Sequence, residues 1–141
     1  MAFYHVYEMF LESSIRGYHA YKKEEVFIGE IMICEQENDN EYDEYAVSVC
    51  KESGKMVGHV PIELSKVFSN FLRDYGEIEA ECIGSRYNAG AGKGLELPAD
   101  YKLIGTYNYL IKVKKEIEKL DSSLSLKCTA VEPSNSSLNI S

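Results

Sequence analysis

Turn residues interrupt this chain every few positions, so most of its segments are long enough for a β-strand but too short for a helix. The clearest signal is ESGK at 52–55, which separates two strand-like segments at 45–51 and 56–60 and predicts a hairpin. Further strands are expected at 3–10, 13–21, 26–35 and 77–87, with two short strands at 95–104 that are split near Pro98. No longer segment repeats, which excludes a solenoid.

Two segments carry a helical pattern instead. Pro61 is expected to open the first helix, because the missing N–H of a proline has no partner in a first turn. Apolar residues then recur at spacings of three and four, which predicts one buried face; they are Leu64, Val67, Phe68, Phe71 and Leu72. The second helix is expected at 108–120, with a stripe formed by Leu110, Val113, Ile117 and Leu120. Many short strands with two helices predict a mainly β fold, a small barrel-like domain at 1–120, followed by a disordered Ser-rich tail at 121–141.

Composition limits the classes of function. The chain has 141 residues and a formal net charge of −8, which argues against a protein that coats long duplex DNA but leaves room for a small pocket for a strand end. Its cysteines form no CxxC pair and are expected to be free thiols in a reducing compartment; they are Cys34, Cys50, Cys82 and Cys128. No apolar run approaches the roughly 20 residues that span a bilayer. An intracellular protein, in the nucleus or the cytoplasm, is therefore expected; the sequence leaves its oligomeric state open.

The stretch ENDNEYDEYAV at 37–47 concentrates carboxylates and amides just before a strand. Three interpretations compete: a solvated turn, a cation site and a recognition loop. A calcium loop that starts at Asp39 would need Gly at its sixth position and Glu at its twelfth, where this chain has Glu44 and Cys50. The calcium interpretation is therefore disfavoured.

Other familiar chemistries also lack support. The glycine-rich GAGKG at 90–94 would need Gly in place of Tyr87 and Ser or Thr in place of Gly94 to match a nucleotide-binding loop, so a hairpin turn is favoured. Arg86 and Lys93 flank this turn with no acid between 84 and 94, and its backbone N–H groups could approach a phosphate. No histidine has zinc spacing and no nucleophile has an evident base. We expect no metal, no cofactor and no catalysis.

Four segments together resemble the HIRAN domain. They are RGYHAY at 16–21, EQENDNEYDEYAVSV at 35–49, GKMVGHVP at 54–61 and the helix ELSKVFSNFL at 63–72. The second segment resembles the family signature Glu-Pro-x-Asn-x-x-Asp-x-x-Ala-Val, and the resemblance spans about 15–104. Family members occur at the front of SNF2-type DNA-remodelling ATPases and as stand-alone modules. In one such ATPase the domain is an OB-like β-barrel that captures the 3′ end of single-stranded DNA.

The resemblance implies a role for each matched residue. Asp43 would accept a hydrogen bond from the terminal hydroxyl, Tyr42 would stack on the terminal base, and Arg16 would pair with a phosphate. Asn40 would bond a base edge or brace the loop, and His59 would reach a phosphate. The full set expected to bind nucleic acid is Arg16, Tyr18, Asn40, Tyr42, Asp43, His59, Arg86 and Lys93.

Simpler alternatives stay open for these residues. Asn40 and Asp43 could only hydrogen-bond their own turn, Tyr42 could be core, and Arg16 could only neutralise nearby acids. Ile62 stands where the DNA-binding relative has a phosphate-contacting Lys.

Leu95 stands where that relative has an aromatic residue. These departures predict weak, salt-sensitive binding at most. The alternative function is a protein-interaction or adaptor domain on the same fold, without DNA binding. A hydrolase is suggested only by the family's association with ATPases.

Overall fold

The computed structural model describes residues 6–17, 25–74, 76–90, 94–120 and 127–134. Within these ranges it contains a mainly antiparallel sheet and two helices, which confirms the expected fold class. In chain order the elements are β1 (Tyr7–Ile15), β2 (Ile31–Gln36), β3 (Val47–Cys50), β4 (Met56–His59), α1 (Ile62–Arg73), β5 (Glu77–Cys82), β6 (Tyr87–Asn88), β7 (Leu95–Gly105), α2 (Tyr107–Glu118) and β8 (Glu132–Pro133).

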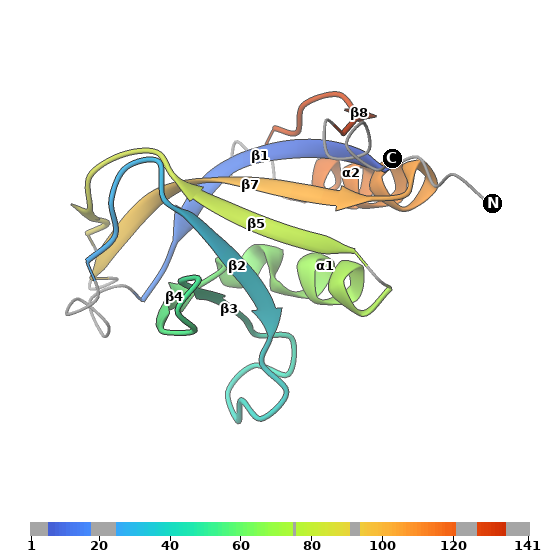
Figure 1. Cartoon of the computed structure of the whole chain (residues 1–141). Coiled ribbons are helices and arrows are strands. Elements are labelled where there is room, and N and C mark those ends of the chain that lie inside the picture. The colour runs from blue at the N-terminus through green and yellow to red at the C-terminus, as the bar shows by residue number, and fades with distance from the viewer. Residues whose placement is uncertain (1–5, 18–24, 75, 91–93, 121–126, 135–141) are drawn as a thin grey trace.

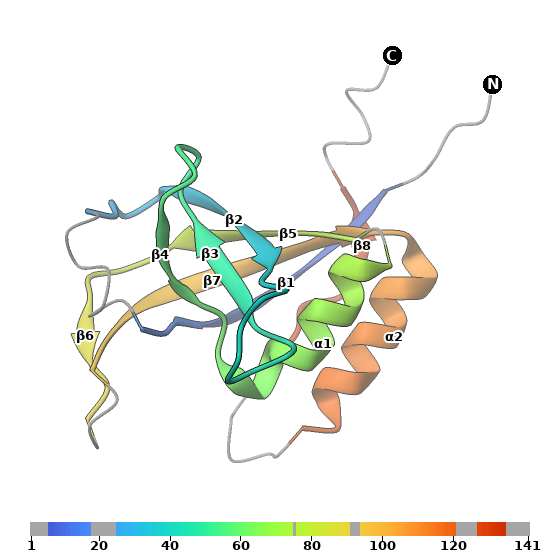
Figure 2. The ribbon, with the colours of Figure 1, turned by 90° about the horizontal axis from the view of Figure 1, so that it is seen from below.

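The sheet has the strand order β4-β3-β2-β5-β7-β1-β8, and β6 pairs with β7 outside this path. Both helices lie on the same face of the sheet (Figure 1). Figure 2, a view from below, shows α1 and α2 side by side. The apolar stripes of the helices therefore have a strand layer to pack against, as their spacing predicts.

The core lies between the helices and the inner face of the sheet. On β5, Ile78, Ala80 and Cys82 alternate with exposed or half-buried glutamates. The buried rings of Phe68 and Tyr101 meet edge to face, with centroids 5.3 Å apart. The Tyr101 hydroxyl donates a hydrogen bond of 2.6 Å to the carbonyl oxygen of Ser14, so this buried polar group is satisfied.

All four cysteines are free thiols, as expected. Cys34 is buried on β2, and burial raises the pKa of its thiol well above the usual range. Cys128 is half-buried, and burial with the nearby charge of Glu118 raises the pKa of its thiol to about 11. Neither thiol is therefore activated as a nucleophile.

One contact links β4, at one edge of the sheet, to the end of β1, near the other edge. Arg16 and His59 form an isolated antiparallel bridge in which each N–H donates to the other residue's carbonyl oxygen at 2.8 Å. This bridge links the end of β1 to the end of β4 across the strand order. The sheet is curled toward an OB-like barrel but is not closed along its whole length.

The expected strand boundaries were wrong at both long strands. The segments at 3–10 and 13–21 were predicted as separate strands, but β1 is one strand over Tyr7–Ile15, and residues 18–21 lie outside the described ranges. The predicted break near Pro98 is absent, because β7 runs continuously over Leu95–Gly105. A strand residue points its N and C=O to the same side, and the Pro98 carbonyl accepts from the N–H of Ile83. The missing N–H of Pro98 thus faces the side where the β5–β7 pairing has already ended.

The strand predicted at 26–35 starts later than expected. Residues 27–30 form a turn, in which Glu30 N–H donates to the carbonyl oxygen of Phe27 at 2.9 Å and Gly29 has a φ of 92°. Only Gly tolerates this φ without strain. The turn delays β2 to Ile31.

Part of the stretch expected to be a disordered tail packs on β1. β8 pairs with the start of β1, Cys128 forms a bridge with Leu11, and the Ser134 N–H donates to the Val6 carbonyl oxygen at 2.8 Å. Cys128 and Val131 pack against the core, which offsets the cost of ordering this segment. The domain division after residue 120 stays a prediction. In the described ranges, neither helix is long and apolar enough to cross a membrane.

Candidate functional site

The acidic stretch before β3 folds as a loop that is held by its own side chains. Asn40 Oδ1 accepts hydrogen bonds from the N–H groups of Tyr42 at 2.8 Å and Asp43 at 3.0 Å. Asp43 Oδ1 in turn accepts from the Tyr45 N–H at 2.9 Å. Both residues therefore shape their own turn, as the simpler interpretation predicts. Asp43 is half-buried, and the structure gives its second carboxylate oxygen no hydrogen-bond partner among the described residues.

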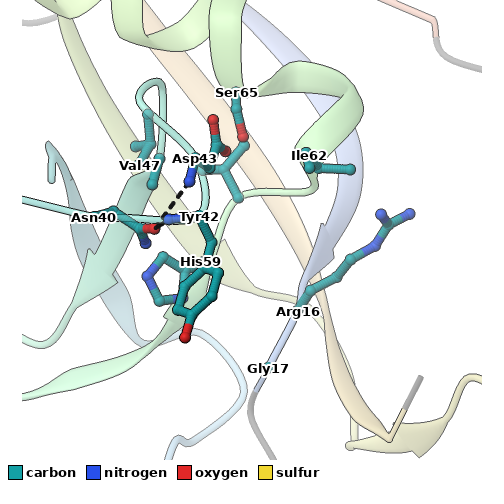
Figure 3. A pocket seen from close by; sticks show the side chains of 11 residues that line it. Arg16, Gly17, Asn40, Tyr42, Asp43, Val47, His59, Ile62 and Ser65 are labelled. Carbon is teal, nitrogen blue, oxygen red and sulfur yellow. Dashed lines mark hydrogen bonds between the residues drawn. The ribbon is translucent and has the colours of Figure 1, made fainter. Parts of the chain in front are cut away.

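A pocket of about 330 Å³ lies between this loop, the end of β1 and the start of α1 (Figure 3). Its volume is in the range of small-molecule sites. It is lined by Arg16, Gly17, Asn40, Tyr42, Asp43, Ala46, Val47, His59, Val60, Ile62 and Ser65. The structure thus brings together predicted residues from three separate segments, the end of β1, the loop and the β3–β4 hairpin.

Tyr42 projects from the loop at the mouth of this pocket. Its side chain is 96% exposed, which overturns the alternative that it belongs to the core. An aromatic ring that is left in water exposes apolar surface, which is unfavourable in free energy. Its ring is therefore open for a base or another flat ligand group to stack on.

Arg16 is already paired with carboxylates. Its Nη1 lies 2.9 Å from Glu63 Oε1 and 2.8 Å from Glu63 Oε2, and its Nε lies 3.7 Å from Glu96 Oε2. In Figure 3 its guanidinium extends along the side of the pocket opposite the loop, and does not point toward the Asp43 carboxylate. Arg16 therefore does neutralise nearby acids, as the simpler alternative predicts.

His59 is also engaged by an acid. Its Nε2 lies 2.5 Å from Glu37 Oε2, and both side chains are less than a third exposed. Its backbone holds the bridge to Arg16, so the ring is fixed at the wall of the pocket. Glu37, at the start of the loop, is thereby tied to β4.

Carboxylates outnumber cations around this pocket in the described part of the chain. Arg16 contacts Glu63 and Glu96, and His59 contacts Glu37. A fourth acid, Asp43, lines the pocket. Such an excess of negative charge favours a ligand group that donates hydrogen bonds over a bare anion. A hydroxyl fits the pocket electrostatically better than an uncompensated phosphate does.

Several predicted residues lie away from this pocket. Arg86 lines a different cavity, beside Phe27 and Ile28. Tyr18 and Lys93 lie outside the described residues. Leu95 is half-buried and pairs with Asn88 in the β6–β7 hairpin.

Ile62 lines the pocket and is 67% exposed, so an apolar side chain does stand at the position that was noted as a lost lysine. Sequence reasoning missed Glu63 and Glu96 as partners of Arg16. The acid in the first turn of a helix was a signal for Glu63. A buried glutamate in a strand gave no signal for Glu96, whose side chain is only 5% exposed.

Among the residues that the structure describes, no three His, Cys, Asp or Glu side chains are grouped to hold a metal ion. The carboxylates of the loop and its surroundings instead contact backbone N–H groups, His59 and Arg16. Of the three interpretations of the acidic stretch, the cation site thus gains no support.

The comparisons with known proteins agree on one family. The model of the HIRAN domain matches residues 9–102. The crystal structure of the HIRAN domain of human HLTF is similar with a TM-score of 0.65 and 21% identity, over 80% of this chain and 91% of that one. The NMR structure of the HLTF HIRAN domain in its DNA-bound conformation is similar with a TM-score of 0.60 and 22% identity, over 78% of this chain and 86% of that one. No curated protein matches the chain.

Proposed function

The chain belongs to the HIRAN domain family, and on that premise we propose that it is a non-catalytic nucleic-acid-binding module whose loop pocket captures the 3′ end of single-stranded DNA. The solved HLTF domain that it resembles has a DNA-bound conformation. Such a ligand implies a location inside the cell, in the nucleus or the cytoplasm.

The observation that carries this proposal is the pairing of an open aromatic ring with a carboxylate at one pocket. Tyr42 is almost fully exposed at the mouth, and Asp43 lines the wall with one oxygen that has no described hydrogen-bond partner. The terminal base would stack on Tyr42, a contact worth about 1–3 kcal/mol. The terminal 3′ hydroxyl would donate its hydrogen bond to Asp43, where a charged acceptor makes a stronger bond than a neutral one.

The remaining polar groups would serve the first phosphates of the strand. Arg16 and His59 also line the pocket, and each would exchange a carboxylate partner for a phosphate oxygen. Only a few phosphates can be neutralised in this way. For a single strand, each of them lowers the logarithm of the binding constant by about 0.7 for a tenfold rise in salt concentration, so the total salt dependence would be small. Binding would be weak and end-specific.

A titration with short labelled strands tests the proposal. Oligonucleotides with a 5′ fluorophore and a free 3′ hydroxyl are compared with the same strands that carry a 3′ phosphate, by fluorescence anisotropy at low salt. We expect the free hydroxyl to bind at least tenfold more tightly, because the phosphate would meet the Asp43 carboxylate. Equal binding of both strands, or none, would contradict end capture.

A second candidate is a protein-interaction domain, favoured by the outer face of the sheet. Ile31 and Ile33 on β2 are 46% and 47% exposed. On the neighbouring strand β5, Glu81 pairs with Ile31 and Glu79 pairs with Ile33. An apolar strip between carboxylates suits a basic, partly apolar partner. Capture of such a partner that is lost with Ile33→Ser and retained with Asp43→Asn would favour this function.

A further inference from the structure

The carboxylate of Glu63 stands at the place beside the pocket that is best suited to an anion. Both of its oxygens contact Arg16 Nη1, at 2.9 and 2.8 Å. Glu63 also lies in the first turn of α1, whose N-cap has no side-chain hydrogen bond. The backbone N–H groups of a first turn have no intrahelical acceptor, and the helix dipole favours negative charge there.

The neighbours of Glu63 in this turn open onto the pocket. Ile62 and Ser65 both line it, together with Arg16. An anion in the pocket would therefore meet the same guanidinium and the same helix end that Glu63 now occupies. The carboxylate and a phosphate of the bound strand would compete for one position.

We propose that Glu63 is an intramolecular competitor for the phosphate of the bound strand and so sets the affinity of the pocket. The inference rests on the proposed function, since it concerns the same pocket and the same ligand. On binding, a phosphate oxygen takes Arg16 Nη1, and the Glu63 carboxylate turns outward to solvent. Binding is an exchange of one anion for another, and it gains less than the new contact alone would give.

Glu63 can leave Arg16, whereas Glu96 cannot. The Glu63 side chain is 30% exposed, so water can solvate it after the exchange. The Glu96 side chain is 5% exposed and accepts a hydrogen bond from the Tyr87 hydroxyl at 3.2 Å. Glu96 therefore stays beside Arg16 in both states and holds the guanidinium in position.

Glu63→Gln removes the competing charge with little change in shape. Its affinity for a 5′-labelled oligothymidylate with a free 3′ hydroxyl is measured by anisotropy beside that of the wild-type chain. We expect Kd to fall about fivefold, which is the value of a partly exposed ion pair. Glu77→Gln is the matched control, because it removes the same charge from an exposed site at the start of β5 and is expected to change Kd less than twofold.

Arg16→Gln supplies the second arm of a double-mutant cycle. In that background Glu63→Gln should tighten binding no more than Glu77→Gln does, because the shared cation is gone. Glu63→Ala should act in the same direction as Glu63→Gln, which guards against a hydrogen bond from Arg16 to the new amide. Thermal unfolding of each variant shows whether it is folded at the temperature of the titration.

The results separate this inference from the proposed function. If the wild-type chain binds and Glu63→Gln behaves like Glu77→Gln, competition by Glu63 is wrong and strand-end binding stands. If Glu63→Gln gains equally with and without Arg16, the effect is only a change of net charge and the inference is also wrong. If neither the wild-type chain nor Glu63→Gln binds, both are overturned.

Discussion

Gly58 has no room for a side chain, because the bridge between the end of β1 and the end of β4 passes directly over it. A Cβ at this position would lie 2.5 Å from the Arg16 carbonyl oxygen and 2.7 Å from Ile15 Cγ2. The Arg16 carbonyl oxygen is the group that accepts the N–H of His59. The glycine therefore permits the contact that fixes Arg16 and His59 at the pocket.

Gly58→Ala should lower the free energy of unfolding by about 2 kcal/mol, in the range of an overpacked core site. The backbone of Arg16 must move away, so the bridge weakens and both pocket walls shift. Urea denaturation followed by circular dichroism gives the stability. Ser53→Ala in the exposed turn of the same hairpin is the control and should change it by less than about 0.5 kcal/mol. A Gly58→Ala variant as stable as the control would show that the approach of β1 to β4 is looser than described.

The Tyr42 side chain is not part of the core, so its removal should weaken ligand binding without changing the stability of the protein. Tyr42→Ala is expected to weaken binding of a free 3′ end by about tenfold, within the range of one lost base stack. The free energy of unfolding should stay within about 0.5 kcal/mol of the wild-type value, because the side chain is 96% exposed. Anisotropy titration and denaturation measure the two effects separately. Tyr109→Ala on α2, another exposed tyrosine, should leave Kd unchanged.

At this scale the family signature grouped several residues that do line one pocket, but it also included Arg86, which lines another cavity, and it did not give the partners of Arg16. The spacing of Asn40 and Asp43 in the family signature placed both at the pocket that the structure shows. The ion pairs of Arg16 were not predictable, because Glu63 and Glu96 come from a helix and a strand far along the chain. Such contacts depend on side-chain orientation across elements, which periodicity does not encode.

Three adjacent strands carry carboxylates at the same register position on the outer face of the sheet. Glu12 on β1 pairs with Asp100 on β7, and Asp100 pairs with Glu81 on β5. Like charges directly opposite one another destabilise a sheet. The pKa of the Asp100 carboxyl is raised above its usual value. The largest cause is partial burial, followed by the negative charges of Glu81 and then Glu12.

Asp100→Asn should therefore stabilise the protein at pH 7. Because the pKa is raised in the folded state, the folded protein binds this proton more readily than the unfolded chain does. Stability falls as pH rises through the interval from the unfolded to the folded pKa, and the full penalty is present above it. We expect a gain of about 0.5 kcal/mol at pH 7, a small value because solvent screens the largely exposed row.

Denaturation at pH 7 and at pH 3 checks this prediction. At pH 3 the carboxyl is mostly protonated in both states, so the variant and the wild-type chain should be equally stable. Glu52→Gln in the β3–β4 turn, an exposed acid outside the row, controls for the change in net charge and should gain less. A gain that is equal at both pH values would argue against charge repulsion as the cause.

Elements were predictable where local patterns are strong. The hairpin at 52–55 and both helices were found, since turn residues and apolar spacing are local signals. The continuity of β7 through Pro98 was missed, because it depends on where the neighbouring strand stops pairing. That end of β5 is a tertiary feature, and a proline rule that is applied to one segment cannot see it.

The position of the pocket follows from how the whole sheet curls. The strand order runs from β4 to β8, and among the described residues only the Arg16–His59 bridge links β4 to the end of β1, the strand next to β8. The pocket lies beside this bridge and is lined by residues of β1, the loop, β4 and α1. Ligand binding and closure of the sheet should thus be coupled, since a ligand held by both walls binds the closed form more tightly.

The segment at 127–134 extends the sheet at its other edge and should contribute to the stability of the whole domain. Cys128 and Val131 pack against the core, and the buried Ser134 hydroxyl donates to Glu8 Oε2 at 3.1 Å. A chain that stops at residue 126 loses these contacts and exposes the outer edge of β1. We expect its free energy of unfolding to fall by about 2 kcal/mol, from two half-buried side chains and the lost hydrogen bonds.

A chain that stops at residue 134 is the control, because it keeps β8 and every described contact of this segment. Urea denaturation of both truncated chains and the full chain measures the loss, and a titration with a free 3′ end measures binding. The shorter chain should bind as the full chain does under conditions where it is folded, since the pocket lies where the end of β1 meets β4, whereas β8 pairs with the start of β1. Equal stability of the two truncated chains would mean that 127–134 adds nothing to the stability of the domain.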